Sequence, residues 1–429
     1  MSSLREPVAV IGTGYVGLVS AVGFAELGSD VWCVDIDADK IAMLERGEMP
    51  IYEPGLAEAV AANRERLHFS TELQVALEHC RLLFIAVGTP PTYSGDADLS
   101  SVNAVVAAMP SSDRHAIVMK STVPVGTGRA IRRELERSGK AAMQYVSCPE
   151  FLKEGVALDD IRHPDRVVVG DDADGWAGDA VVALYAPLHA PLVRTDIASA
   201  EMIKLAANAF LATKISFINE IANVCEETGA DVLEVARGMG LDRRIGEHFL
   251  RAGIGFGGSC FPKDVSALKQ LAGNSGYHFQ LLNAVIEVNE LQKRRVVAKL
   301  QKHLGSLVGR RIALLGLAFK AQTDDMREAA SLVLAARLQG EGAAVRAYDP
   351  VAGEQARGLM GGVELASTAL EAVSGADAIV LVTEWPEFAA LDWSAVKARA
   401  AGDVLVDGRN FLDGESVRAA GFVYEGVGR

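Results

Sequence analysis

Short apolar runs alternate with helical patterns along the first part of the chain. The runs contain almost no polar positions, which is typical of parallel strands whose two faces are both covered. Helical spacing of apolar residues fills the stretches between them, for example at 102–109 and 129–137. The alternation predicts a doubly wound α/β domain with strands at Val8–Ile11, Val31–Asp35, Leu82–Val87, Ala116–Met119 and Arg166–Val169, and a further extended segment at Gln144–Ser147.

A long segment without glycine or proline follows, from Ala198 to Thr228. We expect one helix that ends at Gly229, and at about 1.5 Å per residue it would span roughly 45 Å. Such a helix can join two domains and offer a subunit interface. Lys204 and Asn208 lie on one face of it, as polar positions in an otherwise apolar stretch.

Helical patterns continue after this segment at 232–239, 247–251, 265–271 and 279–304. Strand patterns return after Gly305, at 311–315, 343–349, 378–383 and 404–407, and predict a second doubly wound domain. Its first turn offers only Gly316, so it need not hold a dinucleotide. We therefore expect three domains: a Rossmann domain at 1–197, a helical domain with the long connecting helix at 198–305, and a Rossmann-like domain at 306–429.

The first strand leads directly into a glycine-rich turn and a helix. Gly12, Gly14 and Gly17 form the turn, and Asp35 ends the second strand at about the distance expected of a ribose-binding acid. The first glycine permits a tight turn, the second lets the backbone approach a pyrophosphate, and the third packs helix on strand. A carboxylate at Asp35 would repel a 2′-phosphate, so the motif predicts NAD rather than NADP. A helix–strand turn with incidental glycines is the alternative.

A second glycine-rich stretch, Gly253–Asp264, places a single thiol beside a cation and a carboxylate. The glycines allow the backbone to fold tightly against a ligand, and Pro262 stops a helix from running backwards through Cys260. Lys263 adds a positive charge that favours a thiolate. A structural turn with a buried cysteine is the alternative, but the pattern makes Cys260 a candidate nucleophile.

Polar loops follow two strands of the first domain, at the strand ends where such folds bind ligands. They are Gly88–Pro90 and Lys120–Thr127. Further on, Glu150 and Glu154 are spaced to face one side of a helical turn, where two acids could take part in proton transfer. A solvated acidic face explains the same spacing, so both interpretations stay open.

Composition excludes several classes of protein. The 429 residues carry 42 Lys and Arg against 56 Asp and Glu, a net charge of −14, which argues against a nucleic-acid or anionic-membrane binder. The five cysteines show neither disulfide-framework nor zinc-site spacing, so we expect a reducing cytoplasm and no metal. The N-terminus has no signal-type segment, and no apolar run reaches membrane-spanning length.

With these residues assembled, the chain resembles the UDP-glucose/GDP-mannose dehydrogenase family over about residues 7–412. The resemblance is carried by Ile11–Gly17, Gly88–Pro90, Ser121–Thr127, Pro149–Gly155, Lys204 with Asn208, Gly257–Asp264, Leu315–Lys320 with Thr323–Asp325, and Asp407–Asn410. It implies an N-terminal NAD domain, a C-terminal domain for the UDP part of the substrate, and a long helix that forms a homodimer.

The resemblance also implies a reaction, the four-electron oxidation of UDP-glucose at C6 to UDP-glucuronate with two NAD used in turn. Cys260 would capture the aldehyde as a thiohemiacetal, which a second hydride transfer converts to a thioester that water hydrolyses. The implied catalytic residues are Cys260, Lys204, Asn208, Asp264, Glu150, Glu154 and Thr122. The lysine and asparagine would stabilise the oxyanion, Glu150 would be the base with Glu154 as helper, and Asp264 with Thr122 would position water or relay a proton.

Binding residues follow from the same resemblance. Cofactor contacts are implied at Gly12, Gly14, Tyr15, Val16, Gly17, Asp35, Lys40, Thr89, Thr122, Glu154, Lys263 and Arg327. Substrate contacts are implied at Phe151, Leu152, Lys204, Asn208, Arg244, Phe249, Gly253, Gly257, Lys320 and Arg409, with Arg244 offered across the dimer interface.

The chain departs from the family pattern at two places. Cys148 stands where the family usually has Asn, so the loop that carries Glu150 can be held differently and an extra thiol can lie near the cofactor. Ala321 replaces the usual proline, and Glu328–Ser331 replaces Glu-Ser-Pro-Ser. Neither departure touches Cys260.

Two other hypotheses stay open. A sister enzyme could oxidise GDP-mannose or a UDP-N-acetylhexosamine, because pocket shape decides the choice of base and sugar, although the run Gly257–Asp264 favours UDP-glucose. A non-catalytic NAD-linked sensor could use a reactive thiol to report redox state. The complete set of Lys204, Asn208, Cys260 and Asp264 favours an enzyme, because a sensor needs no oxyanion partner.

Overall fold

The computed structural model describes residues 5–172 and 175–429, and the chain divides into two compact units. The first unit comprises residues 1–207 with 270–275, and the second comprises 208–269 with 276–429. Two helices, α9 (Ile197–Thr228) and α11 (Phe261–Asn274), contribute residues to both units. The segment 198–305 is thus shared between the units, and the three-domain division stays a proposal.

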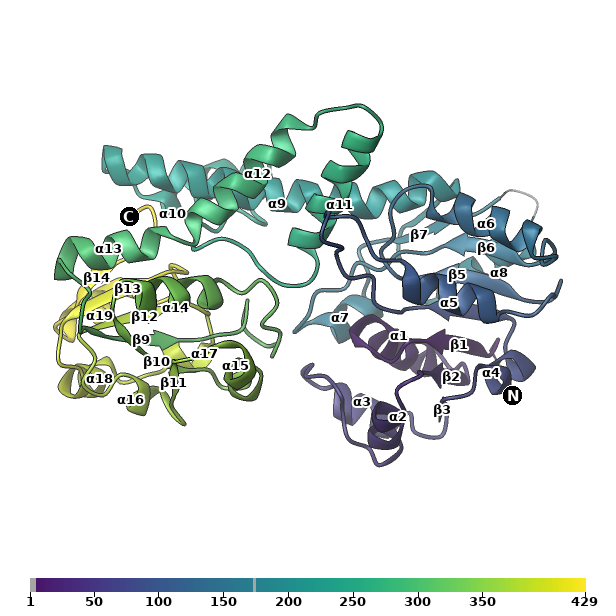
Figure 1. Cartoon of the computed structure of the whole chain (residues 1–429), viewed down its shortest axis with the longest axis horizontal. Coiled ribbons are helices and arrows are strands. Elements are labelled where there is room, and N and C mark those ends of the chain that lie inside the picture. Colours follow the sequence, from purple (N-terminus) through teal and green to yellow (C-terminus); the bar gives the residue numbers. More distant parts are fainter. Residues whose placement is uncertain (1–4, 173–174) are drawn as a thin grey trace. The chain divides into compact units, whose positions relative to one another are not determined.

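The first unit is built on a sheet of eight strands among the described residues, in the order β3-β2-β1-β4-β5-β6-β7-β8 (Figure 1). Neighbouring strands are parallel except β6 and β7, which pair in opposite directions through Ser147 and Gly170. The strands are β1 (Val8–Ile11), β2 (Val31–Val34), β3 (Leu67–Ser70), β4 (Leu82–Ile85), β5 (Ala116–Met119), β6 (Gln144–Ser147), β7 (Val167–Gly170) and β8 (Leu192–Thr195).

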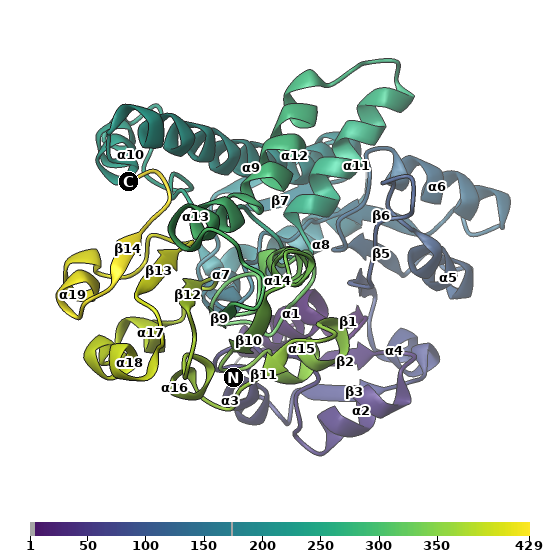
Figure 2. The ribbon, with the colours of Figure 1, turned by 60° about the vertical axis from the view of Figure 1, so that its left-hand side comes forward.

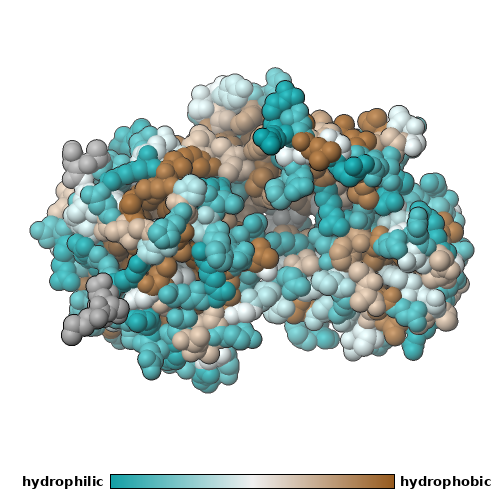
Figure 3. All heavy atoms as spheres, turned by 180° about the vertical axis from the view of Figure 1, so that it is seen from behind, coloured by the Kyte–Doolittle hydropathy of each residue, from teal (hydrophilic) through white to brown (hydrophobic). Residues whose placement is uncertain are grey.

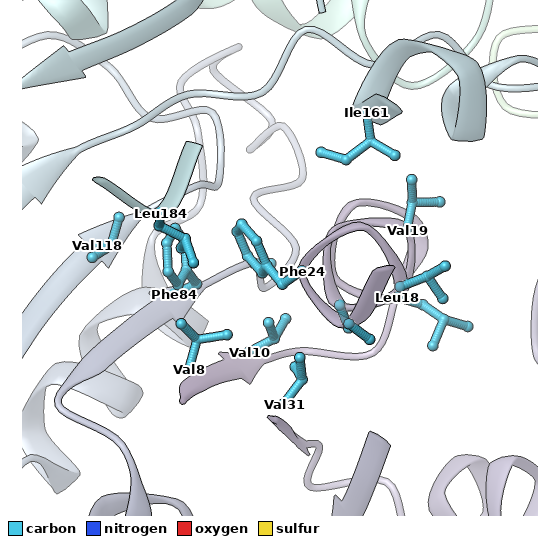
Figure 4. Close-up of a cluster of buried hydrophobic side chains, with 14 of the residues drawn as sticks. Val8, Val10, Leu18, Val19, Phe24, Val31, Phe84, Val118, Ile161 and Leu184 are labelled. Atoms are coloured by element: carbon cyan, nitrogen blue, oxygen red, sulfur yellow. The ribbon is translucent and has the colours of Figure 1, made fainter. Parts of the chain in front are cut away.

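Helices cover both faces of this sheet, because alternate residues of each inner strand enter different cores. Val8 and Val10 of β1 pack beneath one set of helices, and Ala9 and Ile11 pack beneath the other. Figure 4 shows the first core, where the rings of Phe24 and Phe84 lie with centroids 4.7 Å apart. The helices are α1 (Tyr15–Glu26), α2 (Ala38–Glu45), α3 (Leu56–Ala62), α4 (Leu73–His79), α5 (Ser100–Ala108), α6 (Thr127–Arg137), α7 (Ala157–Arg162) and α8 (Trp176–Tyr185), with a 3-10 turn at Ala186–Leu188.

The second unit contains a parallel sheet of six strands within the described range, in the order β11-β10-β9-β12-β13-β14. Helices α13 (Arg295–Leu304), α14 and α15 pack on one face and α16 to α19 on the other (Figure 2). The strands are β9 (Arg311–Leu315), β10 (Ala344–Tyr348), β11 (Glu364–Leu365), β12 (Ala378–Leu381), β13 (Val404–Asp407) and β14 (Val423–Glu425). The helices are α14 (Ala330–Gly340), α15 (Gly353–Leu359), α16 (Ala369–Ala372), α17 (Pro386–Ala389), α18 (Trp393–Arg399) and α19 (Gly414–Ala419).

The helices predicted in the middle of the chain require two corrections. Residues 247–251 are not helical, because Gly246 and Phe249 have φ values of 70° and 63°, which a right-handed helix cannot contain. The pattern predicted as one helix at 279–304 is interrupted at Lys293 and Arg294. It forms α12 (Gln280–Gln292) and α13 (Arg295–Leu304), and the remaining helix is α10 (Val232–Gly240).

The doubly wound prediction is confirmed for both sheets, and all the inner strands were predicted. The strands that the pattern missed are β3, β8, β11 and β14, each at the edge of its sheet. In β8, for example, Leu192 and Val193 are exposed. Among the described helices, none is long and apolar enough to cross a membrane.

Candidate active site

The turn between β1 and α1 has the geometry that a dinucleotide requires. A β-carbon on Gly12 would lie 2.6 Å from the carbonyl oxygen of Ala86, and one on Gly17 would lie 1.8 Å from that of Gly12, so both positions need glycine. A β-carbon on Gly14 would point into open space. Gly14 also precedes α1 without any side chain capping the helix, which leaves its first N–H groups available to an anion.

Asp35 follows β2 and turns its carboxylate toward this turn. One oxygen accepts hydrogen bonds from the backbone N–H and the hydroxyl of Thr13, both at 2.8 Å, and the other accepts from the N–H of Asp37 at 3.1 Å. Burial alone would raise the pKa of Asp35, but these bonds and the charge of Lys40 outweigh it, so its pKa lies below the usual value. The ionised carboxylate keeps acceptor capacity for ribose hydroxyls, so the site fits NAD.

The loops after β4 and β5 are fixed to each other and to α9. The Thr89 hydroxyl donates to the backbone carbonyl of Thr122 at 2.9 Å. The buried carboxylate of Glu201 on α9 accepts from the N–H groups of Gly126 and Gly128, both at 2.7 Å, at the start of α6. Glu201 was not predicted, because nothing in its local sequence distinguishes it from a solvated glutamate.

A buried ion pair joins α9 to the loop after β6. The Lys204 Nζ lies 2.9 Å from the Glu150 Oε1, and the two side chains are only 4% and 5% exposed. Burial alone would raise the pKa of Glu150, but the Lys204 ammonium, the N–H of Leu152 and the nearby Lys120 outweigh it and lower the pKa. Glu150 is therefore ionised at neutral pH, in the form that can accept a proton.

The expected single helical face for Glu150 and Glu154 is wrong. Residues 148–153 are irregular, and Glu154 begins a turn. Glu154 instead lies close enough to Tyr15 to contribute to the raised pKa of that hydroxyl, after burial and Glu53. Phe151 covers the ion pair: its ring centroid is 5.4 Å from the Lys204 Nζ and 3.5 Å from the Arg166 guanidinium carbon.

Glu53 fixes the far end of the same loop and was also missed. Its carboxylate accepts from the N–H groups of Gly155 at 2.6 Å and Ala157 at 2.7 Å, and from the Tyr15 hydroxyl. Tyr15 begins α1, so this contact ties the loop of Glu150 to the nucleotide turn. Val16, the next residue of α1, packs against the core. Glu53 lies about a hundred residues before Gly155 and Ala157 in the chain, and no local pattern reveals such a contact.

In the second unit, Cys260 occupies the N-cap position of α11. Its carbonyl accepts the first helical hydrogen bond, from the N–H of Asp264 at 2.8 Å. The thiol is partly exposed, and the hydroxyl of Ser259 lies 3.5 Å from its sulfur. The N–H groups at this helix end favour a negative charge on the sulfur. Pro262 lies in the first turn, where a missing N–H costs little.

Two predicted catalytic residues meet directly beside the thiol's helix. The Asn208 amide donates to the buried Asp264 carboxylate at 2.6 Å, and Lys263 pairs with the other oxygen of Asp264 at 2.6 Å. Asn208 follows Lys204 by four positions on α9, so the two side chains leave the helix on the same face. Each therefore holds one carboxylate.

Three buried amides hold the glycine-rich loop, and none was predicted. Asn289 donates to and accepts from the backbone of Phe256, at 3.0 and 2.8 Å. Gln292 donates to the carbonyl of Gly253, and Asn219 accepts from its N–H, both at 2.9 Å. The loop glycines are needed here because a β-carbon on Gly257 would lie 2.3 Å from the carbonyl oxygen of Glu328.

Arg409, predicted to bind substrate, clamps this loop in the structure. Its guanidinium donates to the carbonyls of Val382, Gly255 and Phe319 at 2.8, 3.0 and 3.1 Å. Other predicted binding residues lie elsewhere. Three of them form ion pairs near the surface: Arg244, which is highly exposed, with Asp242, Arg327 with Asp325, and Lys40 with Asp37. The ring of Phe249 contacts that of Phe261. The Lys320 Nζ lies 5.4 Å from the ring centroid of Phe319.

The first turn of the second sheet differs from that of the first. Asp349 ends β10 as Asp35 ends β2, but one of its oxygens accepts from the N–H groups of Leu317 and Ala318 and from the indole of Trp385. Its other oxygen accepts from Val351 and Ala352. The carboxylate is buried and fully used by the protein, so it does not offer the ribose contact that Asp35 can make.

Comparison with known proteins matches three parts of the chain to three domain types. Residues 6–189 match the NAD binding domain of the UDP-glucose/GDP-mannose dehydrogenase family, 198–291 its central domain and 313–414 its UDP binding domain.

Relatives match over nearly the whole chain. The UDP-glucose 6-dehydrogenase TuaD of Bacillus subtilis (strain 168) is 48% identical, over 99% of this chain and 93% of its own length. The UDP-glucose 6-dehydrogenase of Rhizobium meliloti (strain 1021) is 46% identical, over 98% and 99%. A UDP-glucose dehydrogenase structure from Pyrobaculum islandicum, 39% identical, superposes with a TM-score of 0.92 over 100% of this chain and 98% of its own. The chain therefore belongs to the UDP-glucose/GDP-mannose dehydrogenase family, as an NAD-dependent oxidoreductase.

Proposed function

We propose that the protein oxidises the C6 alcohol of UDP-glucose to a carboxylate. The observation that carries this proposal is the thiol of Cys260 at the start of α11, next to the Asn208 and Asp264 pair. The similar proteins from Bacillus subtilis and Rhizobium meliloti are named UDP-glucose 6-dehydrogenases, which supports this choice of sugar. NAD supplies the hydride acceptor for both oxidation steps.

The chemistry assigned to Cys260 follows from its position. The first oxidation leaves an aldehyde at C6, and a thiolate that attacks this carbon forms a thiohemiacetal. Loss of a second hydride from that adduct leaves a thioester. Water then cleaves the carbon–sulfur bond, which yields the carboxylate and returns the thiol. The N–H groups at the start of α11 favour the thiolate that begins this sequence, whereas the charge of Lys263 is paired with Asp264.

Lys204 and Asn208 are the proposed partners of the charge that develops on the C6 oxygen. They are hydrogen-bond donors on one face of α9, and each is already oriented by a carboxylate, Glu150 and Asp264 respectively. Glu150 is the proposed base, with Glu154 as helper. Asp264 and Thr122 are proposed to position water or relay a proton.

Binding roles are proposed for the remaining predicted residues. The turn Gly12–Gly17 and Asp35 receive the pyrophosphate and adenosine ribose of NAD. Lys320 is proposed to contact the nucleotide sugar. Arg409 is proposed to act on substrate mainly through the loop that it clamps, because its guanidinium already serves three carbonyls.

We also propose that α9 forms a homodimer interface. Met202, Phe210, Phe217 and Val224 are exposed along one face of this helix at spacings of seven or eight residues, which keeps them within one stripe. A contiguous apolar stripe on a protein surface is typical of an interaction site. A second copy of the same helix presents the same stripe, so the surface is complementary to itself. The face of the molecule shown in Figure 3 carries apolar patches, in brown, among hydrophilic residues.

A reducing cytoplasm is the proposed compartment. The five cysteines are all free within the described residues, and the proposed nucleophile must remain a thiol to work.

The choice of sugar is tested by measuring NADH formation with UDP-glucose, GDP-mannose and UDP-N-acetylmannosamine. We expect turnover of UDP-glucose with two NADH per sugar. The third compound is included because a UDP-D-ManNAc dehydrogenase from Pyrococcus horikoshii superposes with a TM-score of 0.86 at 28% identity over 99% of both chains. Turnover of another sugar with none of UDP-glucose would contradict the proposal, and NAD binding without any turnover would support the sensor hypothesis.

Replacement of the thiol tests the covalent mechanism. Cys260→Ser should lower net turnover of UDP-glucose by roughly 10³-fold or more, because an alkoxide forms a poorer intermediate than a thiolate. The measurement is steady-state NADH formation, with mass spectrometry of the protein for a trapped sugar adduct. Cys225→Ala, which removes a buried thiol of α9, should leave turnover near the wild-type value. Full activity of Cys260→Ser would exclude the thioester route.

Removal of the ribose-binding acid tests the NAD site. Asp35→Ala should weaken NAD binding by about 10- to 100-fold, because hydrogen bonds to a charged group contribute about 1.5–3 kcal/mol. The measurement is calorimetric titration with NAD, and Asp39→Ala, an exposed acid on the following helix, is the control. Unchanged affinity of the Asp35 variant would place the cofactor elsewhere.

A charge in the stripe of α9 tests the dimer. Phe217→Glu should shift the molar mass measured by light scattering from two chains to one, because the paired helices would bury like charges. Leu359→Glu, at an exposed apolar position of α15, should leave the mass unchanged. A monomeric wild-type protein, or a Phe217→Glu variant that remains dimeric, would exclude this interface.

A further inference from the structure

A small cavity lies behind the carboxylate of Glu150 in the first unit. It is bordered by the end of β5, the loop after β6, the segment before β7 and the end of α8. The residues of interest in its lining are Lys120, Cys148, Glu150, Arg166 and Tyr185. The space open to water is about 40 Å³. A single water molecule needs roughly 10–15 Å³ of such space, so the cavity has room for a few.

One hydroxyl in the lining has no hydrogen-bond partner among the described residues, and a buried ammonium lies beside its ring. The Tyr185 hydroxyl is buried and lies near the thiol of Cys148, which is a weak acceptor. The Lys120 side chain is 4% exposed, and its charge acts on the neighbouring Glu150 and Cys148. Its contact is the ring of Tyr185, 5.4 Å from the centroid. Buried groups of this kind are usually satisfied by ordered water.

The cavity also extends from a buried group toward the surface. Glu150 borders its inner end, whereas Asp165, whose side chain is 86% exposed, and Arg166 border it further out. The charged groups that face this space are Lys120, Arg166, Asp160 and Asp165, with Lys204 on the other side of Glu150. Asp160 is itself paired with Lys153 at 2.8 Å.

The proposed reaction needs such a route because it releases protons. When a hydride leaves C6 with both electrons of its bond, the proton of the hydroxyl oxygen remains for a base to accept. Hydrolysis of the thioester by water gives the carboxylate, the Cys260 thiol and a further proton. Glu150, the proposed base, must therefore pass on each proton before it can accept another.

We propose that ordered water in this cavity, held by Tyr185 and Lys120, carries protons between Glu150 and solvent beside Arg166. The inference rests on the role of Glu150 in the proposed function. Tyr185 and Lys120 are positioning residues in this scheme, since they act on Glu150 through water. The positive charges of Lys120 and Lys204 favour the ionised carboxylate, so a proton taken up by Glu150 is readily released.

The test uses Tyr185→Phe, which removes one hydroxyl and keeps the ring that packs in the core. With UDP-glucose as substrate, kcat should fall about tenfold, while KM for UDP-glucose and NAD stays within a factor of about two. Added imidazole should restore kcat in a concentration-dependent manner, because a small base can replace a proton route but cannot repair a misfolded site. Tyr145→Phe is the matched control: it removes another buried hydroxyl, on β6, that has no hydrogen-bond partner among the described residues and does not line this cavity. Its kcat should be unchanged.

A second variant and a crystal structure test the water route independently. Lys120→Met should show the same loss of kcat and the same rescue, and the wild-type crystal structure should show water within hydrogen-bonding distance of the Tyr185 hydroxyl. A dry cavity, or Tyr185→Phe and Lys120→Met variants with wild-type kcat, pH profile and response to imidazole, would overturn the proposal. Glu150→Gln distinguishes failure of the proposed base from failure of the water route. Full activity of this variant would show that Glu150 is not the base. An inactive Glu150→Gln variant beside unaffected Tyr185→Phe and Lys120→Met variants would reject only the water route.

Discussion

The ion pair between Lys204 and Glu150 is the interaction on which the arrangement of the first unit's catalytic groups depends. Both charges are almost completely buried, and loss of either partner would leave the other uncompensated, at a cost of about 3–5 kcal/mol. The pair fixes α9 against the loop after β6. Glu201, one turn earlier on α9, fixes the same helix against the loop that carries Thr122. The position of α9 therefore sets the position of the loops around it.

Helix α9 also positions catalytic groups of the second unit. Asn208 follows Lys204 by one helical turn and holds the carboxylate of Asp264 on α11. Because Cys260 caps α11, the thiol and Asp264 are separated by one turn of a rigid element. The glycine-rich loop before the thiol is held by buried amides from α9 and α12 rather than by regular structure. The side chains of these two helices thus fix the conformation of the glycine-rich loop.

The two sheets show how one architecture serves two purposes. Each begins with a strand, a turn with a glycine at positive φ, and an acid at the end of the next strand. Asp35 retains acceptor capacity, whereas Asp349 is used up by backbone N–H groups and an indole. The first turn therefore suits a dinucleotide, and the second matches the family's UDP binding domain without that ribose contact.

The sequence alone determined the strands that are buried on both faces. It also determined the motifs whose residues are close neighbours in the chain. Inner strands such as β1, β4, β5 and β12 form continuous apolar runs and were predicted for that reason, and the mixed segment Gln144–Ser147 was predicted as extended, whereas β3, β8, β11 and β14 lie at sheet edges and lack such runs. The nucleotide turn and the Cys260 loop are local, and were recognised for that reason. Only the tertiary structure decided that Glu150 pairs with Lys204, that Glu53 and Glu201 hold backbone N–H groups, and that Arg409 clamps a loop. These contacts join residues far apart in the chain, and their energy comes from burial, which exists only once the chain has folded.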